Sequence, residues 1–281
     1  MRFRDILLQI DSYPATTPHE TIEAAIGFAK ALDAGIAILA LQVDIPLSRN
    51  FITEALVGLA GLEQEWEAAS LAGCREALRR FELAATAAGV FAGAEIGRIN
   101  LFKVDDTLVR RVRTRDLCLT SLAERFEEQV EWVRRAIFES GRPVLVMGGH
   151  PILSAGRIGD VAVAWDGTRS AARALADALP ILERARAVRI VTFINEKEAA
   201  RPGLAAEAAR HLATHGVQAA IDEIDASGQR IGRAIDAYLE QRPADILVMG
   251  ASGHAPVLDF VMGGATDHVL RNPPTALLLS H

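Results

Sequence analysis

The chain has 281 residues, of which 50% are hydrophobic and 23% charged, and its formal net charge is −6 at pH 7. This length exceeds that of one average domain and suits two domains of about 140 residues, each with its own core. The acidic balance argues against nucleic acid as the main partner, and no apolar run reaches the roughly 18 residues that span a membrane.

The N-terminus and the two cysteines predict a cytoplasmic protein. The first apolar run, Ile6–Ile10, is too short for the core of a signal peptide, and an aspartate stands on each side of it. Cys74 lies in an expected helix and Cys118 in an expected strand. Both are therefore expected to be small buried side chains in a reducing compartment.

Apolar runs and helical patterns alternate in the first half of the chain. The run Ile6–Ile10 ends at Asp11, and a helix is expected over Thr17–Leu32. Further buried strands are predicted over Ile36–Val43, Phe91–Ile99, Asp116–Thr120 and Arg142–Met147. The runs are continuous rather than alternating, which is typical of parallel strands covered on both faces. The arginine-rich segment Arg110–Arg115 is expected to form a solvated helix face rather than a binding patch.

The stretch from Asp44 to Gly89 is longer than a crossover helix requires. Its apolar residues Phe51, Leu56, Leu59 and Leu62 surround two glycines, Gly58 and Gly61. It has two interpretations: a kinked second helix, or a cover or docking surface.

The second half repeats the order of the first. An apolar run from Asp160 ends at Asp166, and helical spacing follows from Ala171 to Leu182. Further strands are predicted over Val188–Ile194, Val217–Ile224, Asp245–Met249 and Pro274–Leu279. The glycine- and proline-containing segment Gly148–Gly159 is expected to link the two halves.

This pattern predicts an α/β fold in which each half is a doubly wound parallel sheet with right-handed crossovers. The fifth strand is apolar in both halves, and an exposed apolar edge strand invites pairing. A linker of about 12 residues keeps the two edges close together. We therefore expect Val144–Met147 and Thr275–Leu279 to pair within one chain, as an intramolecular pseudo-dimer. The surface 51–62 is a candidate contact for a homodimer of such chains.

A loop punctuated by glycines follows the fourth strand of the second half. Gly250, Gly253 and Gly263 follow the spacing Gly-x2-Gly-x9-Gly, and Gly264, Ala265 and Thr266 come next. The loop lies between an apolar run and an amphipathic segment. A strand, a glycine loop and a helix start together place backbone N–H groups at the positive end of a helix dipole, which usually binds phosphate.

The first half lacks this loop. Residues 116–140 contain no glycine, and a helix is expected over Ala123–Glu139. Four glutamates lie in its first turns and would repel an anionic ligand: Glu124, Glu127, Glu128 and Glu131. We therefore expect no nucleotide site in the first half.

The internal repeat, the strand that runs into Asp166-Gly-Thr-Arg-Ser170, and the spaced glycines together resemble a tandem member of the universal stress protein family. The resemblance is specific in the second half and rests on the pattern of elements in the first. It implies two Rossmann-like (HUP-type) domains, residues 1–150 and 157–281, each with strand order 3-2-1-4-5. One branch of the family binds ATP and another does not.

The resemblance also implies roles for individual residues of the second half. Asp166 would meet the adenosine part, Phe193 would line the adenine pocket, and Met249 with Gly250 would close it. The residues implied around the ribose and phosphates are Gly253, Gly263, Gly264, Ala265 and Thr266. The implied cofactor is ATP with Mg²⁺.

Two residues depart from the ATP-binding pattern of the family. Gly264 stands where a hydroxyl or amide side chain is usual, and Thr266 is the candidate to replace that group. Asp259 lies in the insert between the second and third glycines, and a carboxylate beside a triphosphate is unfavourable without Mg²⁺. Neutral His254 adds little charge there at pH 7.

The usual catalytic motifs are missing from the sequence, and its histidines and cysteines show no metal-ligand spacing. The sequence therefore predicts a cytoplasmic stress-response protein that binds a nucleotide through its second half as a regulatory module, rather than an enzyme. Two alternatives stay open. One is a ligand-free interaction protein with a vestigial loop, and the other is a slow nucleotide hydrolase that uses Asp259 or His254.

Overall fold

The described part of this computed structural model comprises residues 2–44, 59–100, 106–122, 127–148, 152–154, 156–195, 202–254, 261–262 and 264–281. Its elements alternate between strands and helices in both halves of the chain, in the order that the sequence predicts.

The first half contains five strands and four described helices. In chain order they are β1 (Asp5–Asp11), α1 (His19–Ala31), β2 (Gly35–Asp44), α3 (Leu59–Ala88), β3 (Phe91–Asn100), α4 (Thr107–Val112), β4 (Leu117–Ser121), α5 (Glu127–Glu139) and β5 (Val144–Met147). The predicted strands and the helix after β1 are all confirmed, with boundaries that differ by a few residues.

The second half repeats this order. It contains β8 (Asp160–Ala164), α6 (Arg169–Leu182), β9 (Ala187–Ile194), α7 (Ala205–Thr214), β10 (Ala219–Asp225), α8 (Ile231–Gln241), β11 (Ile246–Gly250), α9 (Gly264–Arg271) and β14 (Ala276–Ser280). Two short hairpins complete the fold, β6 (Leu153–Ser154) with β7 (Arg157–Ile158), and β12 (Gly253–His254) with β13 (Val261–Met262).

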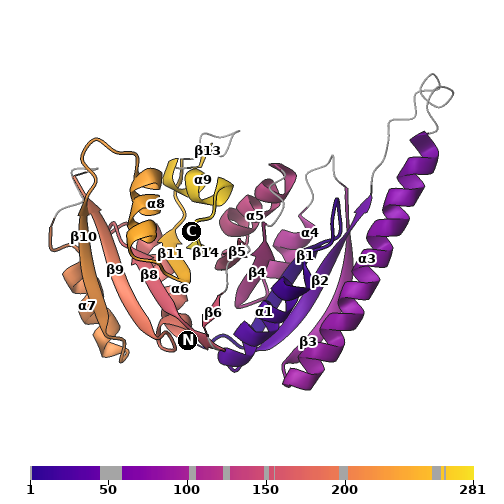
Figure 1. The fold of residues 1–281 in the computed structure, drawn as a ribbon, viewed down its shortest axis with the longest axis horizontal. Helices are drawn as coiled ribbons and strands as arrows, with labels where there is room; N and C mark the ends of the chain where they lie inside the picture. Colours follow the sequence, from indigo (N-terminus) through magenta and orange to yellow (C-terminus); the bar gives the residue numbers. More distant parts are fainter. Residues whose placement is uncertain are drawn as a thin grey trace.

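All ten long strands belong to one sheet, in the order β10-β9-β8-β11-β14-β5-β4-β1-β2-β3 (Figure 1). Each half therefore has the predicted order 3-2-1-4-5, and its strands are parallel. The expectation of two separate sheets is corrected, because β5 and β14 pair antiparallel and join the halves into a single sheet. This is the fifth-strand pairing that the sequence predicts, with Leu278 opposite Leu145.

The sheet separates two apolar cores, one on each face. One core lies under α1, α3, α6 and α7, and the other lies under α4, α5, α8 and α9. Leu145 and Leu278 both point into the first core, and both are fully buried. Each core therefore crosses the junction between the halves and includes side chains from both.

The helix α3 has 30 residues and runs along the outer strands of the first half (Figure 1). Its described stretch contains no proline and is rich in alanine, leucine, glutamate and arginine, which favour helix formation. Phe51, Leu56 and Gly58 lie outside the described residues, so the predicted cover or docking surface remains a prediction. Among the described ranges, no helix combines the length and the apolar composition needed to cross a bilayer.

The segment between the halves does more than link them. The hairpin β6–β7 places Ile152 and Ile158 in the core, where both are 1% exposed. The side chain of Leu153 packs against Gly27 of α1, where an added Cβ would lie 3.0 Å from its Cδ1. The hairpin is therefore a packed element of the fold.

Both cysteines are free and buried, as predicted. Burial raises the pKa of the Cys118 thiol to about 12 and also raises that of Cys74. Both thiols are therefore protonated at neutral pH.

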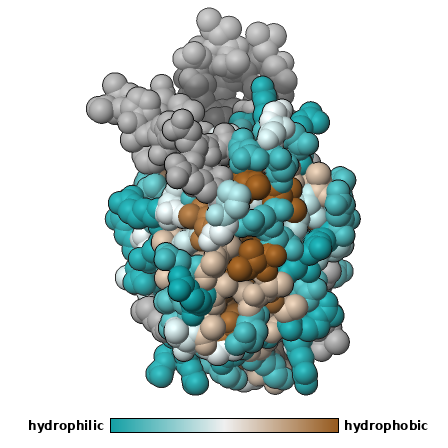
Figure 2. Space-filling model, turned by 90° about the vertical axis from the view of Figure 1, so that its left-hand side faces the viewer, coloured by the Kyte–Doolittle hydropathy of each residue, from teal (hydrophilic) through white to brown (hydrophobic). Residues whose placement is uncertain are grey.

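The outer edge of the second half is the strand β10. Figure 2 shows apolar side chains gathered on the face around this edge, among polar neighbours. Ile221 of β10 is 43% exposed. Acidic residues follow it along the strand, namely Asp222, Glu223 and Asp225, and charges on an edge strand are a common way to discourage pairing with another chain.

Candidate functional site

The glycine loop lies at the carboxyl end of β11. This strand is the neighbour of β8, and the strand order of the half reverses between these two strands. Open α/β sheets bind ligands outside the carboxyl ends of their strands at such a reversal. Here β11 ends at Gly250, the hairpin β12–β13 follows, and α9 begins at Gly264. The structure thus confirms the predicted order of strand, loop and helix.

Hydrogen bonds from neighbouring elements hold the start of the loop. The Ala251 N–H donates to the carbonyl of Ser280 at 2.7 Å, and the Ser252 N–H donates to the Thr266 hydroxyl at 3.2 Å. Thr266 is 1% exposed. Its side chain is therefore buried and stabilises the loop backbone by a hydrogen bond, and it is not exposed at the surface.

The last residue of the chain connects this loop to the first half. The His281 ring contacts the carbonyl of Ala251 through Nδ1 at 3.0 Å. The same ring meets Phe138 of α5 edge to face, with centroids 4.8 Å apart. The glycine loop of one half therefore has a direct contact path to a helix of the other.

The glycines of the loop differ in whether the surrounding structure leaves room for a side chain. A Cβ at Gly250 would lie 2.4 Å from the backbone of both Ser170 and Ala171, so the first turn of α6 leaves no room for a side chain there. At Gly264 an added Cβ would meet nothing within 4 Å. Helix packing alone explains Gly250, whereas among the described residues nothing crowds Gly264. Gly263, His254 as a side chain, and Asp259 lie outside the described parts of the structure.

Asp166 lies just beyond β8, on the strand next to the glycine loop. Its Oδ1 accepts hydrogen bonds from the N–H of Thr168 at 3.0 Å and from the Thr168 hydroxyl at 2.6 Å. The Thr168 side chain in turn caps α6 by accepting from the Ala171 N–H. The carboxylate is thus fixed at the carboxyl-end edge by a local turn that also starts a helix.

Phe193 and Met249 lie in the core beneath this edge. Phe193 is 9% exposed and Met249 is 6% exposed. The Phe193 ring meets Tyr238 of α8 edge to face, with centroids 6.3 Å apart. The phenol of Tyr238 donates to Asp222, and burial together with this bond raises the pKa of Tyr238 to about 12. Phe193 and Met249 can form an apolar floor, but only their outer atoms reach the surface.

The structure therefore gathers the predicted residues Asp166, Phe193, Met249, Gly250 and Ala265 at one edge. It also adds residues that the sequence analysis missed. Asp225, at the end of β10, accepts from the N–H and hydroxyl of Ser227, and these bonds hold the pKa of Asp225 below its usual value. Asn195 follows β9 with a φ of 63°. The signal available in the sequence is the shared pattern Asp-x-Thr/Ser, which recurs after both strands.

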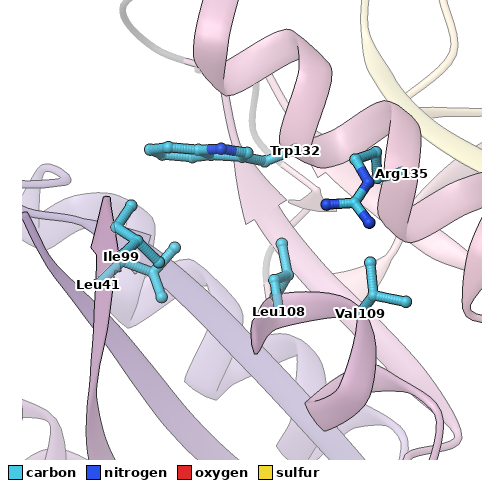
Figure 3. A pocket seen from close by; sticks show the side chains of 6 residues that line it. All are labelled: Leu41, Ile99, Leu108, Val109, Trp132 and Arg135. Carbon is cyan, nitrogen blue, oxygen red and sulfur yellow. The ribbon is translucent and has the colours of Figure 1, made fainter. Parts of the chain in front are cut away.

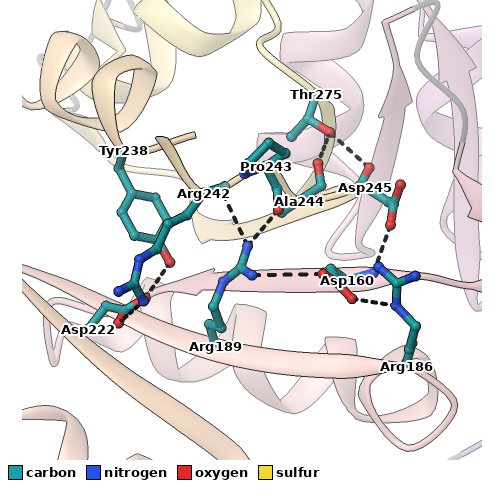
Figure 4. Close-up of polar contacts among 10 residues, drawn as sticks. All are labelled: Asp160, Arg186, Arg189, Asp222, Tyr238, Arg242, Pro243, Ala244, Asp245 and Thr275. Carbon is teal, nitrogen blue, oxygen red and sulfur yellow. Dashed lines mark hydrogen bonds and ion pairs between the residues drawn. The ribbon is translucent and has the colours of Figure 1, made fainter. Parts of the chain in front are cut away.

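The opposite edge of the second half has a different character. There Arg186 and Arg189 share Asp160, at 2.9 Å and 3.8 Å, and Arg189 also donates to the carbonyls of Arg242 and Pro243 (Figure 4). The Arg186 guanidinium holds the pKa of Asp160 below its usual value. Arg186, Arg189 and Asp160 all have partners within this network, which therefore links the starts of β8 and β9 to the segment before β11.

In the first half, the position that corresponds to Asp166 is Asp11, at the end of β1. Asp11 is 7% exposed. Its Oδ1 accepts from the Gln9 amide at 2.7 Å, and its Oδ2 accepts from the amide of Gln129, on α5, at 3.1 Å. The Thr120 hydroxyl donates to Gln9. Burial raises the pKa of Asp11 to about 7, and the Gln9 amide, which favours the ionised form, offsets only part of this rise.

The helix α3 closes the same edge of the first half. The Ser12 hydroxyl donates to the carbonyl of Leu41 at 2.7 Å, and it lies 2.7 Å from the hydroxyl of Ser70, on α3. Ser70 also accepts from the N–H of Val43 at 3.0 Å. Together with the bond from Gln129 to Asp11, these hydrogen bonds fill the carboxyl-end edge of the first half, where the second half has its glycine loop.

A small cavity remains in the first half between α5 and the ends of β2 and β3. The rings and methyl groups of Trp132, Leu41, Ile99 and Leu108 line it, and Arg135 lies at one side (Figure 3). Its volume is about 10 Å³, which admits about one water molecule. Arg135 is paired with Glu139 at 2.8 Å. Within the described residues, no three metal-ligating side chains cluster in either half.

Comparisons with known proteins agree with this geometry. The model of the universal stress protein family matches residues 158–281. A universal stress protein from Archaeoglobus fulgidus DSM 4304 superposes with a TM-score of 0.65 at 16% identity, over 98% of this chain and 97% of that chain. A functionally unknown protein from Pseudomonas aeruginosa PAO1 gives a TM-score of 0.56 at 13% identity, over 99% and 92%. A search of the curated proteins finds no match.

The two structural likenesses are low in identity and show the fold, whereas the family model recognises the sequence of the second half. The chain thus carries a universal stress protein domain in its second half and has, over nearly its whole length, the fold of a universal stress protein.

Proposed function

We propose that this protein is a cytoplasmic stress-response protein whose second half binds one nucleotide, ATP with Mg²⁺, as a regulatory module. The observation that carries the proposal is the edge where β8 ends near Asp166 and β11 runs into the glycine loop and α9. The N–H groups at the start of α9 are suited to phosphate oxygens. Asp166 is the acceptor available for hydroxyl groups of the ribose.

The base would lie over the apolar floor of Phe193 and Met249. The phosphates would follow the backbone of Gly253, Gly263 and Gly264, because a residue without a Cβ lets a ligand approach the backbone closely, and would reach the N–H of Ala265 in the first turn of α9. The lack of any described residue within 4 Å of a Cβ at Gly264 supports this arrangement. Thr266 would contribute indirectly, since its hydroxyl holds the Ser252 N–H.

The first half, as a domain without a nucleotide loop, would bind none. Gln129 donates to Asp11 at the place where a ligand would have to enter, and α3 is fastened across the same edge through Ser70. Opening this edge would leave several buried polar groups without partners, which costs about 1–3 kcal/mol for each group.

A titration of the whole chain with ATP and Mg²⁺ tests the proposal. We expect a stoichiometry near one per chain, and we expect Gly253→Val to abolish binding because a branched side chain blocks the backbone. Ala220→Val, on the exposed strand β10, is the matched control and should bind as the wild type does. Two sites per chain would contradict the closed first half.

A ligand-free interaction protein is the second candidate, and one observation favours it. The hydroxyl that could replace the one missing at Gly264 belongs to Thr266, which is 1% exposed and already engaged. Mass spectrometry of small molecules released from the denatured protein decides between the two. A released nucleotide supports the binding module. Its absence, together with no heat of ATP binding by the folded chain, supports the ligand-free protein, and steady release of phosphate from added ATP would point to a hydrolase.

A further inference from the structure

A cavity between the two halves lies beside α6. Its walls come from the first half at Arg2, Asp116 and Arg142, and from α6 at Arg173 and Asp177. Arg2 and Phe3 thus lie beside α6 at the junction of the halves. The volume is about 50 Å³. Since one water needs about 10–15 Å³ by this measure, the space admits about four waters or one small polyatomic ion.

The charge of these walls is positive. Three arginines and two aspartates are among the residues that line the cavity. Asp177 is already paired with Arg173 at 2.8 Å, and Asp116 accepts the backbone N–H groups of Arg4 and Asp5 at 2.8 Å and 3.0 Å. Arg173 balances the charge of Asp177, whereas the neutral N–H groups orient Asp116 without cancelling its charge, so one positive charge remains in excess on these walls.

Arg2 and Arg142 have no carboxylate partner among the described residues, and Arg173, which bonds Asp177 through Nε, keeps its Nη1 for a ligand. Arg142 donates through Nε to the carbonyl of Arg113 at 3.2 Å, and a carbonyl does not neutralise its charge. Among the described residues, no carboxylate lies within ion-pair distance of Arg2. At the corresponding end of the second half, by contrast, Arg186 and Arg189 both share Asp160 (Figure 4).

We propose that this pocket between the halves binds one small oxyanion of the phosphate class, held by Arg2, Arg142 and Arg173. Guanidinium groups present paired N–H donors that match the oxygens of such an anion. The ligand contacts the first half and α6 of the second half together. Its binding therefore stabilises the paired arrangement of the halves, because a ligand that binds only the folded state raises its stability.

Inorganic phosphate is the probe, with the intact chain and with chloride at equal ionic strength as the reference. We expect a saturable binding signal by calorimetry and a saturable rise of the thermal unfolding midpoint. Arg142→Gln and Arg2→Gln should each weaken binding at least about tenfold, as the loss of one charge-assisted hydrogen bond implies. Arg210→Gln, an equal change of charge on the exposed face of α7, should leave binding unchanged.

Two further results separate this pocket from other causes. Gly253→Val should keep phosphate binding, since the glycine loop is a different site; loss of binding in that variant would place the phosphate in the loop and overturn the proposal. A rise of the midpoint that never saturates and is equal in all variants would also overturn it, because phosphate stabilises proteins generally by exclusion from their surface. Arg2→Gln removes no contact within the described fold, so it stays informative even if Arg142→Gln does not fold.

Discussion

Asp11 and Asp166 stand at the same position of the two halves, yet their surroundings differ completely. Asp11 is buried and bound by two glutamine amides, whereas Asp166 lies in an exposed turn beside a glycine loop. The strands that lead to them have the same order and the same neighbours. The position of the edge therefore follows from the sheet, and whether it is open depends on the helices packed against it, which in the first half are α3 and α5.

The largest expected effect tests the packing of the open edge. Gly250→Val should lower the free energy of unfolding by more than about 4 kcal/mol, because the side chain would overlap backbone atoms at 2.4 Å that cannot rotate away. Urea denaturation measures the change. Gly264→Ala is the matched control and should change stability by less than about 0.5 kcal/mol. A stable Gly250→Val variant would show that α6 can move away from β11.

Because the carboxyl group of Asp11 is buried at the closed edge, the free energy of unfolding should depend on pH. The pKa of Asp11 is about 7 in the folded chain, against an ordinary value of 3.8 for an aspartate in water. Folding therefore favours the protonated form, and this contribution is complete below about pH 3.8 and is lost as the pH rises to about 7. Asp11→Asn should remove the dependence and be more stable than the wild type at pH 8 by roughly 2–4 kcal/mol.

The Gln129 side chain explains why this variant should fold. Its Oε1 is buried without a hydrogen-bond partner among the described residues, so a rotated amide can accept from a protonated Asp11 or from an asparagine. Unfolding midpoints of both proteins between pH 4 and pH 8 check the prediction. Parallel curves for the wild type and Asp11→Asn would mean that Asp11 stays ionised throughout.

A smaller effect should appear on affinity at the open edge. Gly264→Ser adds a hydroxyl at a position that no other described residue crowds, and a serine there should strengthen ATP binding about tenfold if the phosphates lie at α9. Calorimetric titration measures the change, and Gly264→Ala separates the hydroxyl from the effect of the added carbon. Equal affinities for the serine and alanine variants would place the phosphates elsewhere.

The smallest expected effect concerns the hydrogen bond between the Thr266 hydroxyl and the Ser252 N–H. Thr266→Val keeps the shape of the side chain but removes the acceptor of the Ser252 N–H, so we expect a loss of about 1 kcal/mol in unfolding free energy. Amide hydrogen exchange of Ser252 should accelerate in the variant. Unchanged exchange would show that another group protects this amide.

The sequence predicted the fold well because the signals for it are local. Continuous apolar runs such as Ile36–Val43 and Asp245–Met249 mark buried parallel strands, and the recurrence of the runs predicts the repeat and the pairing of the fifth strands. The joined cores were not predicted, since a pattern along the chain does not show which side chains meet across a junction. For the same reason the contact of Gln129 with Asp11, 118 residues apart, was not foreseen.

The candidate site was predicted in part. The spacing of Gly250, Gly253 and Gly263 identifies the loop, but it does not separate a glycine required by packing from one that leaves room for a ligand. That distinction depends on the approach of α6 to Gly250 in three dimensions. The burial of Thr266 likewise depends on how α9 sits on the sheet, which no motif records.

The pairing of β5 with β14 within one chain determines which kinds of half each molecule contains. A dimer of identical subunits would carry two open edges or two closed ones, since both copies share one sequence. Here the two partners are encoded in a single chain, so each molecule holds one of each kind at any dilution. Because the halves are covalently linked, every molecule contains one closed half and one open half. The closed first half can then serve as a scaffold, while the second half keeps the features of a ligand site.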